Sequence, residues 1–168
     1  MQSGIDFLRT QVAEAAAVHS SLLESMVYHE SEADDQRYRD LCDRHLPRMR
    51  EHQLMLEDLR SSLGAPTHLR VRAARSLADA RVSDYQRLEA DLDLARQLEV
   101  TFKTFRDAGR NLRIDGLARL GELAERHHDD YSADAKRLLL QMFIEQAQDA
   151  ADAVRRVAHD SRADSRIR

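Results

Sequence analysis

The sequence is poor in residues that break helices and in residues that favour sheets. It contains 5 Gly, 2 Pro and no Trp among 168 residues. Few turns are therefore encoded, whereas a sandwich or barrel of many short strands would need far more of them. Val and Ile are sparse, while Leu, Ala, Arg and Glu are common, and most of these are good helix formers. The composition therefore predicts long helices in an all-α fold.

Cysteine and long apolar runs are also scarce. Cys42 is the only cysteine, so no internal disulfide can form, and we expect a reducing, cytoplasmic location. No apolar run approaches the roughly 18–20 residues of a membrane span, and no signal peptide is evident. The formal net charge is −4, and arginines alternate with acids along the chain. This pattern is typical of a salt-bridged helical surface and argues against nucleic-acid binding.

Several sequence motifs of enzymes and cofactor-binding proteins are missing. The chain has no glycine-rich phosphate loop, no G-x-S-x-G and no Cys-x-x-Cys. Hydrolase, nucleotide-binding and zinc-ribbon functions therefore find no support.

Apolar residues recur at alternating steps of three and four, the spacing of a single buried helix face. We expect four helices, over residues 3–29, 31–63, 91–127 and 130–159. Ser3 and Ser31 are candidate N-caps, and Gly64 and Pro66 should end the second helix.

Residues 67–90 favour only a short, weakly amphipathic helix, in a connection long enough to cross from one end of a bundle to the other. Pro47 lies inside the second helix and should kink it. The pattern predicts an antiparallel four-helix bundle over residues 1–160, followed by a polar tail over 161–168.

Histidines interrupt the apolar stripes of the first two helices. His19 lies on the first stripe, and His45 and His52 lie on the second. A histidine on such a stripe is more often a hydrogen-bonded core residue than a ligand. Burying three imidazoles without partners is costly, however, and a metal, an acid or ordered water could satisfy them. Glu145 and Asp149 are the candidate acids if they face inward, although both would also suit an exposed helix face. The candidate metal ligands are therefore His19, His45, His52, Glu145 and Asp149, with iron or zinc as the metal.

Two further spacings have weaker support. Glu125 and His128 have the Glu-x-x-His spacing of bundle metal sites. They stand at the expected end of the third helix beside Asp129 and Asp130, where we interpret them as part of a solvated cap. Cys42 and His45 could bind a soft metal, but a buried free cysteine is ordinary.

Two helices carry the motifs of a known family. The segment His45-Leu46-Pro47-Arg48-Met49-Arg50-Glu51-His52, followed by Leu63-Gly64, resembles the YciE/YciF family of ferritin-like bacterial proteins. That family has a His-Leu-x-x-Thr-x-x-His helix running into a Leu-Gly turn. In the fourth helix, Leu138-Leu139 with the later acids Glu145 and Asp149 is also similar. The resemblance implies a ferritin-like four-helix bundle with a long crossover between helices 2 and 3. It also implies a di-metal carboxylate site, a dimer and a role in stress responses.

The sequence departs from this family at its acidic positions. His19 stands near the family's first-helix acid, and Arg110 and Arg113 stand near its third-helix acids. We therefore expect a ferritin-like bundle of the stress-response type, without a complete di-iron site and more in line with a non-enzymatic protein than with an oxidase. It should form a homodimer. One alternative is a metal-binding protein with a His-rich site, and another is a helical module that binds a protein partner. The chain lacks the histidine spacings of hemerythrin-like oxygen binders.

Overall fold

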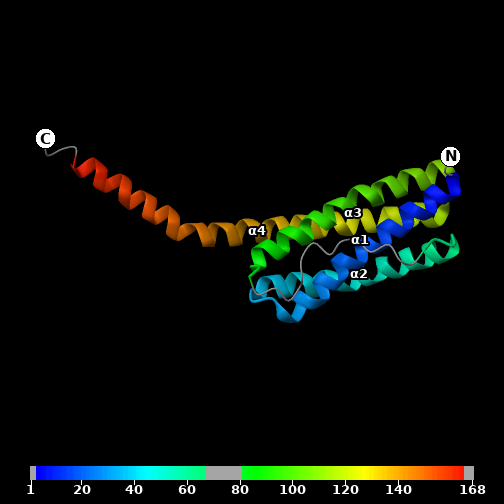
Figure 1. Ribbon diagram of the computed structural model, residues 1–168, viewed down its shortest axis with the longest axis horizontal. Coiled ribbons are helices and arrows are strands. Elements are labelled where there is room, and N and C mark those ends of the chain that lie inside the picture. The colour runs from blue at the N-terminus through cyan, green and yellow to red at the C-terminus, as the bar shows by residue number, and fades with distance from the viewer. Residues whose placement is uncertain (1–2, 67–80, 165–168) are drawn as a thin grey trace.

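The computed structural model describes residues 3–66 and 81–164, and all regular structure in these two ranges is helical. This confirms the all-α prediction. The helices are α1 (Gly4–Glu32), α2 (Gln36–Ser62), α3 (Asp84–Leu112) and α4 (Asp115–Asp164). They form an antiparallel bundle in which α1 packs against α2 and α3, and α4 packs against the same two helices (Figure 1). None of these helices is both long and apolar enough to cross a lipid bilayer.

The chain direction sets which residues share a level of the bundle. α2 ends beside the beginning of α1, whereas α3 begins at the opposite end (Figure 1). Of the segment over 67–90, for which a short helix was expected, residues 67–80 lie outside the described residues, and residues 84–90 form the first turns of α3. All four helices direct buried apolar side chains into one core, which includes Leu22, Leu56, Leu98 and Leu120.

Polar side chains cap the beginnings of the first three helices. The Ser3 side chain accepts a hydrogen bond from the Asp6 amide, as the sequence suggested. Ser31 is no N-cap, because α1 continues through Glu32 and Asp35 caps α2 instead. α2 ends before Gly64, whose φ of 65° requires the left-handed conformation that glycine adopts without strain.

The turn between the last two helices lies well before its expected position. α3 ends at Leu112, and Arg113 adopts the left-handed conformation with φ 58° and ψ 41°. The Ile114 amide then donates to the Gly109 carbonyl at 2.8 Å, which closes the turn. The expected third helix over 91–127 is therefore wrong: its second half belongs to α4.

Two glycines allow α3 and α4 to approach closely. A methyl group at Gly109 would overlap the backbone of Ala118, and one at Gly121 would overlap the backbone of Phe102 and Arg106. Gly116 has no such constraint, because its nearest neighbour would be the Leu59 side chain at 3.9 Å. Gly109 and Gly121 thus bring the two helices together.

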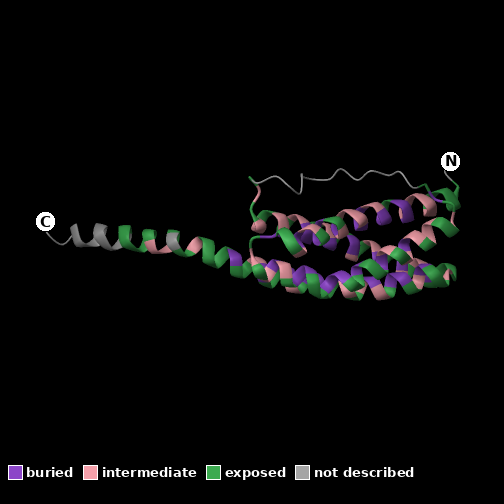
Figure 2. Ribbon diagram, turned by 90° about the horizontal axis from the view of Figure 1, so that it is seen from below, coloured by how far each residue is buried: buried purple, intermediate pink, exposed green. Residues whose placement is uncertain are grey.

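α4 is much longer than its neighbours and projects beyond one end of the bundle (Figure 2). It runs to Asp164, past the expected end at residue 159 and into the expected tail. Its outer face exposes large apolar side chains, namely Leu140, Phe143, Ile144, Val154 and Val157.

Candidate metal centre

Three histidines from three different helices meet inside the bundle. His19 comes from α1, His52 from α2 and His128 from α4. Each is buried, and one nitrogen atom of each lies within 4.8 Å of the corresponding atoms of the other two. The ring centroids of His19 and His128 are 5.2 Å apart, and those of His52 and His128 are 5.5 Å apart. We refer to His19, His52 and His128 as the histidine triad.

A hydrogen bond fixes the tautomer of His19. Its Nδ1 lies 2.8 Å from Gln53 Oε1. Gln53 donates through Nε2 to the Glu57 carboxylate at 3.0 Å, so the Gln53 oxygen must face His19. An oxygen acceptor requires that His19 Nδ1 carry the hydrogen. The lone pair of His19 is therefore on Nε2.

The remaining two histidines are held in the same way. His128 Nδ1 lies 2.8 Å from the Ala124 carbonyl oxygen, so Nδ1 donates and the lone pair is on Nε2. His52 Nε2 lies 2.8 Å from His127 Nδ1. When His52 donates in this bond, its own lone pair is on Nδ1. Such outer hydrogen bonds orient imidazoles that ligate metals.

Each ring of the triad has a second nitrogen atom that no described group satisfies. His19 Nε2, His52 Nδ1 and His128 Nε2 are buried and have no hydrogen-bond partner among the described residues. Burial lowers the pKa of His19 to about 4 and that of His52 to about 3. Burial also holds the pKa of His128 well below its usual value. At neutral pH, the histidine triad therefore presents three neutral imidazoles, and one ligand nitrogen of each lies within 4.8 Å of those of the other two.

The remaining helix, α3, packs an aromatic side chain against the histidine triad. Phe102 of α3 packs against His128, with ring centroids 5.0 Å apart, and against His19 at 6.1 Å. Within residues 3–66 and 81–164, the histidine triad is the one group of three or more clustered His, Cys, Asp and Glu ligands. The centre therefore offers nitrogen ligands and no carboxylate.

The spacing of the triad is somewhat wider than that around a bound ion. Zinc–nitrogen bonds of about 2.0–2.1 Å in tetrahedral geometry place neighbouring nitrogens roughly 3.4 Å apart. The triad nitrogens would have to move inward by roughly 1 Å or less, which small rotations of the imidazole rings can supply.

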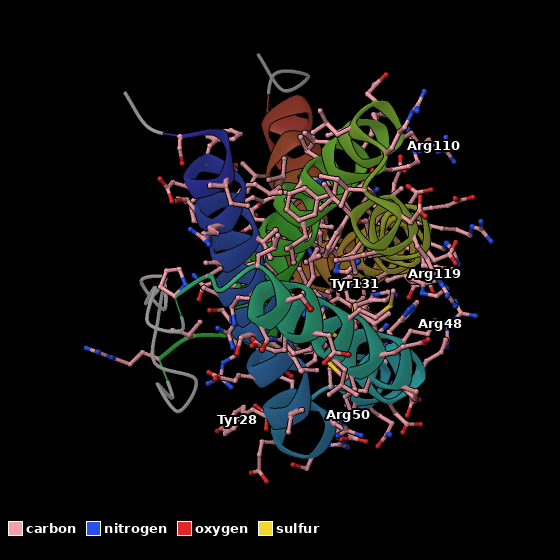
Figure 3. The ribbon with its side chains drawn as sticks, turned by 90° about the vertical axis from the view of Figure 1, so that its right-hand side faces the viewer. Tyr28, Arg48, Arg50, Arg110, Arg119 and Tyr131 are labelled. Carbon is pink, nitrogen blue, oxygen red and sulfur yellow. The ribbon has the colours of Figure 1, made fainter. Side chains whose placement is uncertain are left out.

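Of the expected ligands whose side chains the structure describes, His19 and His52 come together and His45 and Glu145 do not. His45 is buried, as expected, but its Nε2 lies 3.0 Å from Asp134 and its ring meets Tyr131 edge-on at 5.3 Å. In Figure 3, Tyr131 lies between the helices while Arg48 and Arg110 project outward. His45 therefore belongs to a different contact, two helical turns from His52.

Glu145, one of the two expected acids, does not join the histidines. Glu145 is exposed and forms an ion pair with Arg37 at 2.7 Å, because it lies near the end of the bundle where α4 begins to project. The side chain of Asp149 lies outside the described residues. Cys42 is buried, and burial raises the pKa of its thiol, which disfavours the thiolate that binds soft metals.

The interpretation of residues 125–128 as a solvated cap is wrong. These residues lie in the middle of α4, and His128 is fully buried. Glu125 nevertheless does not accompany His128 into the core, since its carboxylate forms an ion pair with Arg106 of α3. The sequence did hold a signal for His128: a continuous three-four stripe runs through Leu117, Leu120, Ala124, His128, Tyr131, Ala135, Leu138 and Met142.

A second buried polar cluster lies nearer the end of the bundle from which α4 projects. Tyr38 donates to Asp91 Oδ2 at 2.6 Å, and the Tyr38 hydroxyl lies 3.2 Å from His29 Nδ1. Ser25 lies 3.1 Å from the same His29 nitrogen. Burial raises the pKa of Asp91 to about 7, so the carboxyl is partly protonated at neutral pH.

Comparisons with known proteins identify the fold. No family model matches the sequence, and no curated protein matches it significantly. The structure is similar to a crystal structure from Bacillus anthracis str. Ames described as "ferritin like, diiron-carboxylate proteins", with a TM-score of 0.69 and 16% sequence identity. The match covers 83% of this chain and 99% of that chain. The protein therefore has a ferritin-like helical bundle fold.

Proposed function

We propose that this ferritin-like bundle binds a single transition-metal ion through His19, His52 and His128. One observation carries the proposal: three buried imidazole nitrogens converge without hydrogen-bond partners, while the opposite nitrogen of each ring is held in place. Buried polar atoms are rarely left unsatisfied, because the desolvation cost is about 1–3 kcal/mol for each group. A cation would accept all three lone pairs at once.

The ligand set favours zinc and other late first-row divalent ions. Neutral imidazoles suit these metals, whereas magnesium and calcium prefer oxygen ligands. Three histidines leave one position of a tetrahedral ion for water or another small ligand. Phe102 limits the space on the α3 side, so any such ligand has to be small.

A di-iron centre does not fit these residues. Two adjacent cations need several anionic ligands, and bundle di-iron sites draw carboxylates from all four helices. Here α1 contributes His19 and α3 contributes Phe102 at the level of the site, and neither is a carboxylate. On α2, Met49 occupies the position three residues before His52 where a Glu-x-x-His motif would have its glutamate. The charge of two ferrous ions would remain largely uncompensated. We therefore propose a mononuclear metal-binding protein without ferritin-type oxidase chemistry.

The test is titration of the metal-free protein with cobalt(II), whose visible absorption reports tetrahedral nitrogen coordination, followed by competition with zinc. We expect one ion per chain. His52→Phe and His128→Asn should each weaken binding at least 100-fold while the far-ultraviolet circular dichroism stays helical. His45→Ala is the matched control, since His45 is also buried on α2 but lies outside the triad.

Three outcomes would contradict the proposal. The first is the absence of cobalt and zinc binding, which would leave the triad as a hydrated core cluster. The second is equal loss of binding in His45→Ala and in the triad variants. The third is binding of two irons per chain with an oxo-bridged absorption band after exposure to air.

The finer assignment to the YciE/YciF family, together with its stress-response role, stays a prediction. The likeness of the second helix and the shared bundle fold support it. Its di-metal carboxylate site is the part that we replace here with a mononuclear one.

A further inference from the structure

An apolar stripe runs along α4 from its last turns beside the bundle into its projecting part, and the bundle leaves most of the stripe exposed. Near the end of the bundle, Phe143 of α4 packs near Tyr85, and Glu145 forms an ion pair with Arg37. Beyond these residues the helix extends away from the other three (Figures 1 and 2). On the same helix, Leu138 and Met142 point into the core. A different face of α4 therefore carries the stripe.

The stripe follows the spacing of a helix–helix interface. Leu140 is 59% exposed, Phe143 57%, Ile144 52% and Val154 69%. These residues and the alanines between them recur at alternating steps of three and four, which places them along one side of the helix. We call this surface the α4 stripe, and it comprises Leu140, Phe143, Ile144, Ala147, Ala150, Ala151 and Val154.

A helix in this setting gains from a partner helix. Most helix stability in proteins comes from packing an amphipathic face against a neighbour. The alanines at the middle of the α4 stripe allow two helix backbones to approach closely. A membrane surface is a poor partner, because it favours bulky apolar residues beside a strongly basic face. Here the residues that alternate with the stripe include Glu145 and Asp152 as well as Arg155 and Arg156.

We propose that the α4 stripe is a homodimer interface in which the α4 helices of two copies of this chain pair antiparallel. A stripe present on every copy is self-complementary about a two-fold axis. Pairing from about residue 140 to the partner's residue 161 gives a contact roughly 33 Å long at 1.5 Å per residue. If the contact covers somewhat more than a third of the solvent-accessible surface of each helix over this length, the two helices together bury roughly 1,100 Å². This exceeds the ~1,000 Å² expected of a specific interface.

Side-chain size favours the antiparallel arrangement over the parallel one. With the two-fold axis between Ala150 and Ala151, the small Ala147 faces Val154 of the second copy, and Ala150 faces Ala151. A parallel pair in register would place Phe143 against Phe143 and Ala147 against Ala147. That arrangement alternates crowded layers with empty ones, and both overpacking and cavities are destabilising.

The experiment measures self-association of the full chain by sedimentation equilibrium. Val154→Glu would place a charge in the apolar interface and should raise the dimer dissociation constant by about 100-fold or more. Arg156→Glu is the matched control, because Arg156 is exposed on the same projecting segment outside the α4 stripe. Engineered cysteines then test the direction, since the natural Cys42 is buried. An equimolar mixture of Ala147→Cys and Val154→Cys proteins should form a mixed disulfide dimer on mild oxidation.

Each alternative result would overturn the proposal. A wild-type chain that stays monomeric up to millimolar concentration has no such interface. A dimer that survives Val154→Glu uses another surface. Disulfide dimers formed by Val154→Cys alone, and more readily than in the mixture, would show parallel helices. All of these outcomes are independent of whether the histidine triad binds metal.

Discussion

Arg106 on α3 forms an ion pair with Glu125 on α4, and Glu125 lies three residues before His128 on the same helix. Residues three apart are neighbours on a helix surface, so Glu125 could reach the metal that we propose for the triad if Arg106 did not hold it. Both side chains are only about a quarter exposed, at 24% and 22%. This ion pair keeps a carboxylate beside the site but outside it.

Replacing Arg106 by Gln should therefore strengthen metal binding. The freed Glu125 would supply an anionic ligand, and we expect about tenfold tighter cobalt binding, equivalent to about 1.4 kcal/mol. The visible spectrum of bound cobalt should change as oxygen coordination is added. The additional change Glu125→Gln should remove both effects.

A matched control lies one helical turn away. Arg110 pairs with Glu122 across the same two helices at 3.2 Å, but Glu122 is six residues from His128. Arg110→Gln should leave the cobalt affinity and spectrum unchanged. If Arg106→Gln and Arg110→Gln behave alike, the Arg106–Glu125 pair acts only as a surface ion pair.

Two glycines of α4 should respond in opposite ways to the same substitution. Gly121→Ala would press a methyl group into the α3 backbone at Phe102 and Arg106, and backbone atoms cannot rotate away. We expect a loss of about 1–3 kcal/mol in the free energy of unfolding. Gly116→Ala would place its methyl group in ordinary contact with the Leu59 side chain, and the protein should gain roughly 0.4–1 kcal/mol because the unfolded chain loses freedom. Urea unfolding followed by circular dichroism gives both values, and equal effects would contradict the close approach.

Asp91 should make stability depend on pH in the direction opposite to most carboxylates. Burial raises its pKa from 3.8 to about 7, so between these values the folded state holds a proton that the unfolded state has lost. Protonated Asp91 therefore makes its full contribution to the free energy of unfolding below about pH 4. This contribution declines by an amount on the order of 4 kcal/mol as the pH rises to about 7. Asp91→Asn should flatten this decline in urea titrations.

Neighbouring groups have to be considered in that comparison. Ser25 and His29 of α1, Tyr38 and Cys42 of α2 and Tyr131 of α4 surround Asp91 or act on its charge. Burial lowers the pKa of His29, which makes stability rise with pH up to about its unfolded value. Both proteins share this effect, so the difference between wild type and Asp91→Asn isolates Asp91. A difference that does not vary between pH 4 and 7 would rule out a raised pKa.

The sequence predicted the helical architecture because helix periodicity is local information. The buried stripes of α1 and α2, to which Leu22 and Leu56 belong, follow directly from apolar residues at steps of three and four. The α3–α4 turn was missed because no glycine or proline marks it: Arg113 supplies the left-handed residue instead. The apolar pattern also continues across the turn, since both helices bury a stripe on either side of it.

Misplacing that turn had a direct effect on the predicted site. Because a helix end was expected near Asp129, the sequence predicted a solvated His128 and left Glu145 as a candidate acid. Whether Glu125 enters the core depends on Arg106, a contact between helices that periodicity cannot reveal. His19 and His52 were found because their own stripes are regular, whereas the separation of His45 depends on Asp134 of another helix.

The triad draws its nitrogens from α1, α2 and α4, segments that meet only once the chain has assembled. An ion there would bind the folded chain and not the unfolded one, so it would stabilise the folded state and slow unfolding. α3 would remain outside this restraint, because its contribution at that level is Phe102. Metal-loaded protein would then open preferentially at α3, and amide hydrogen exchange would slow most in the three ligated helices.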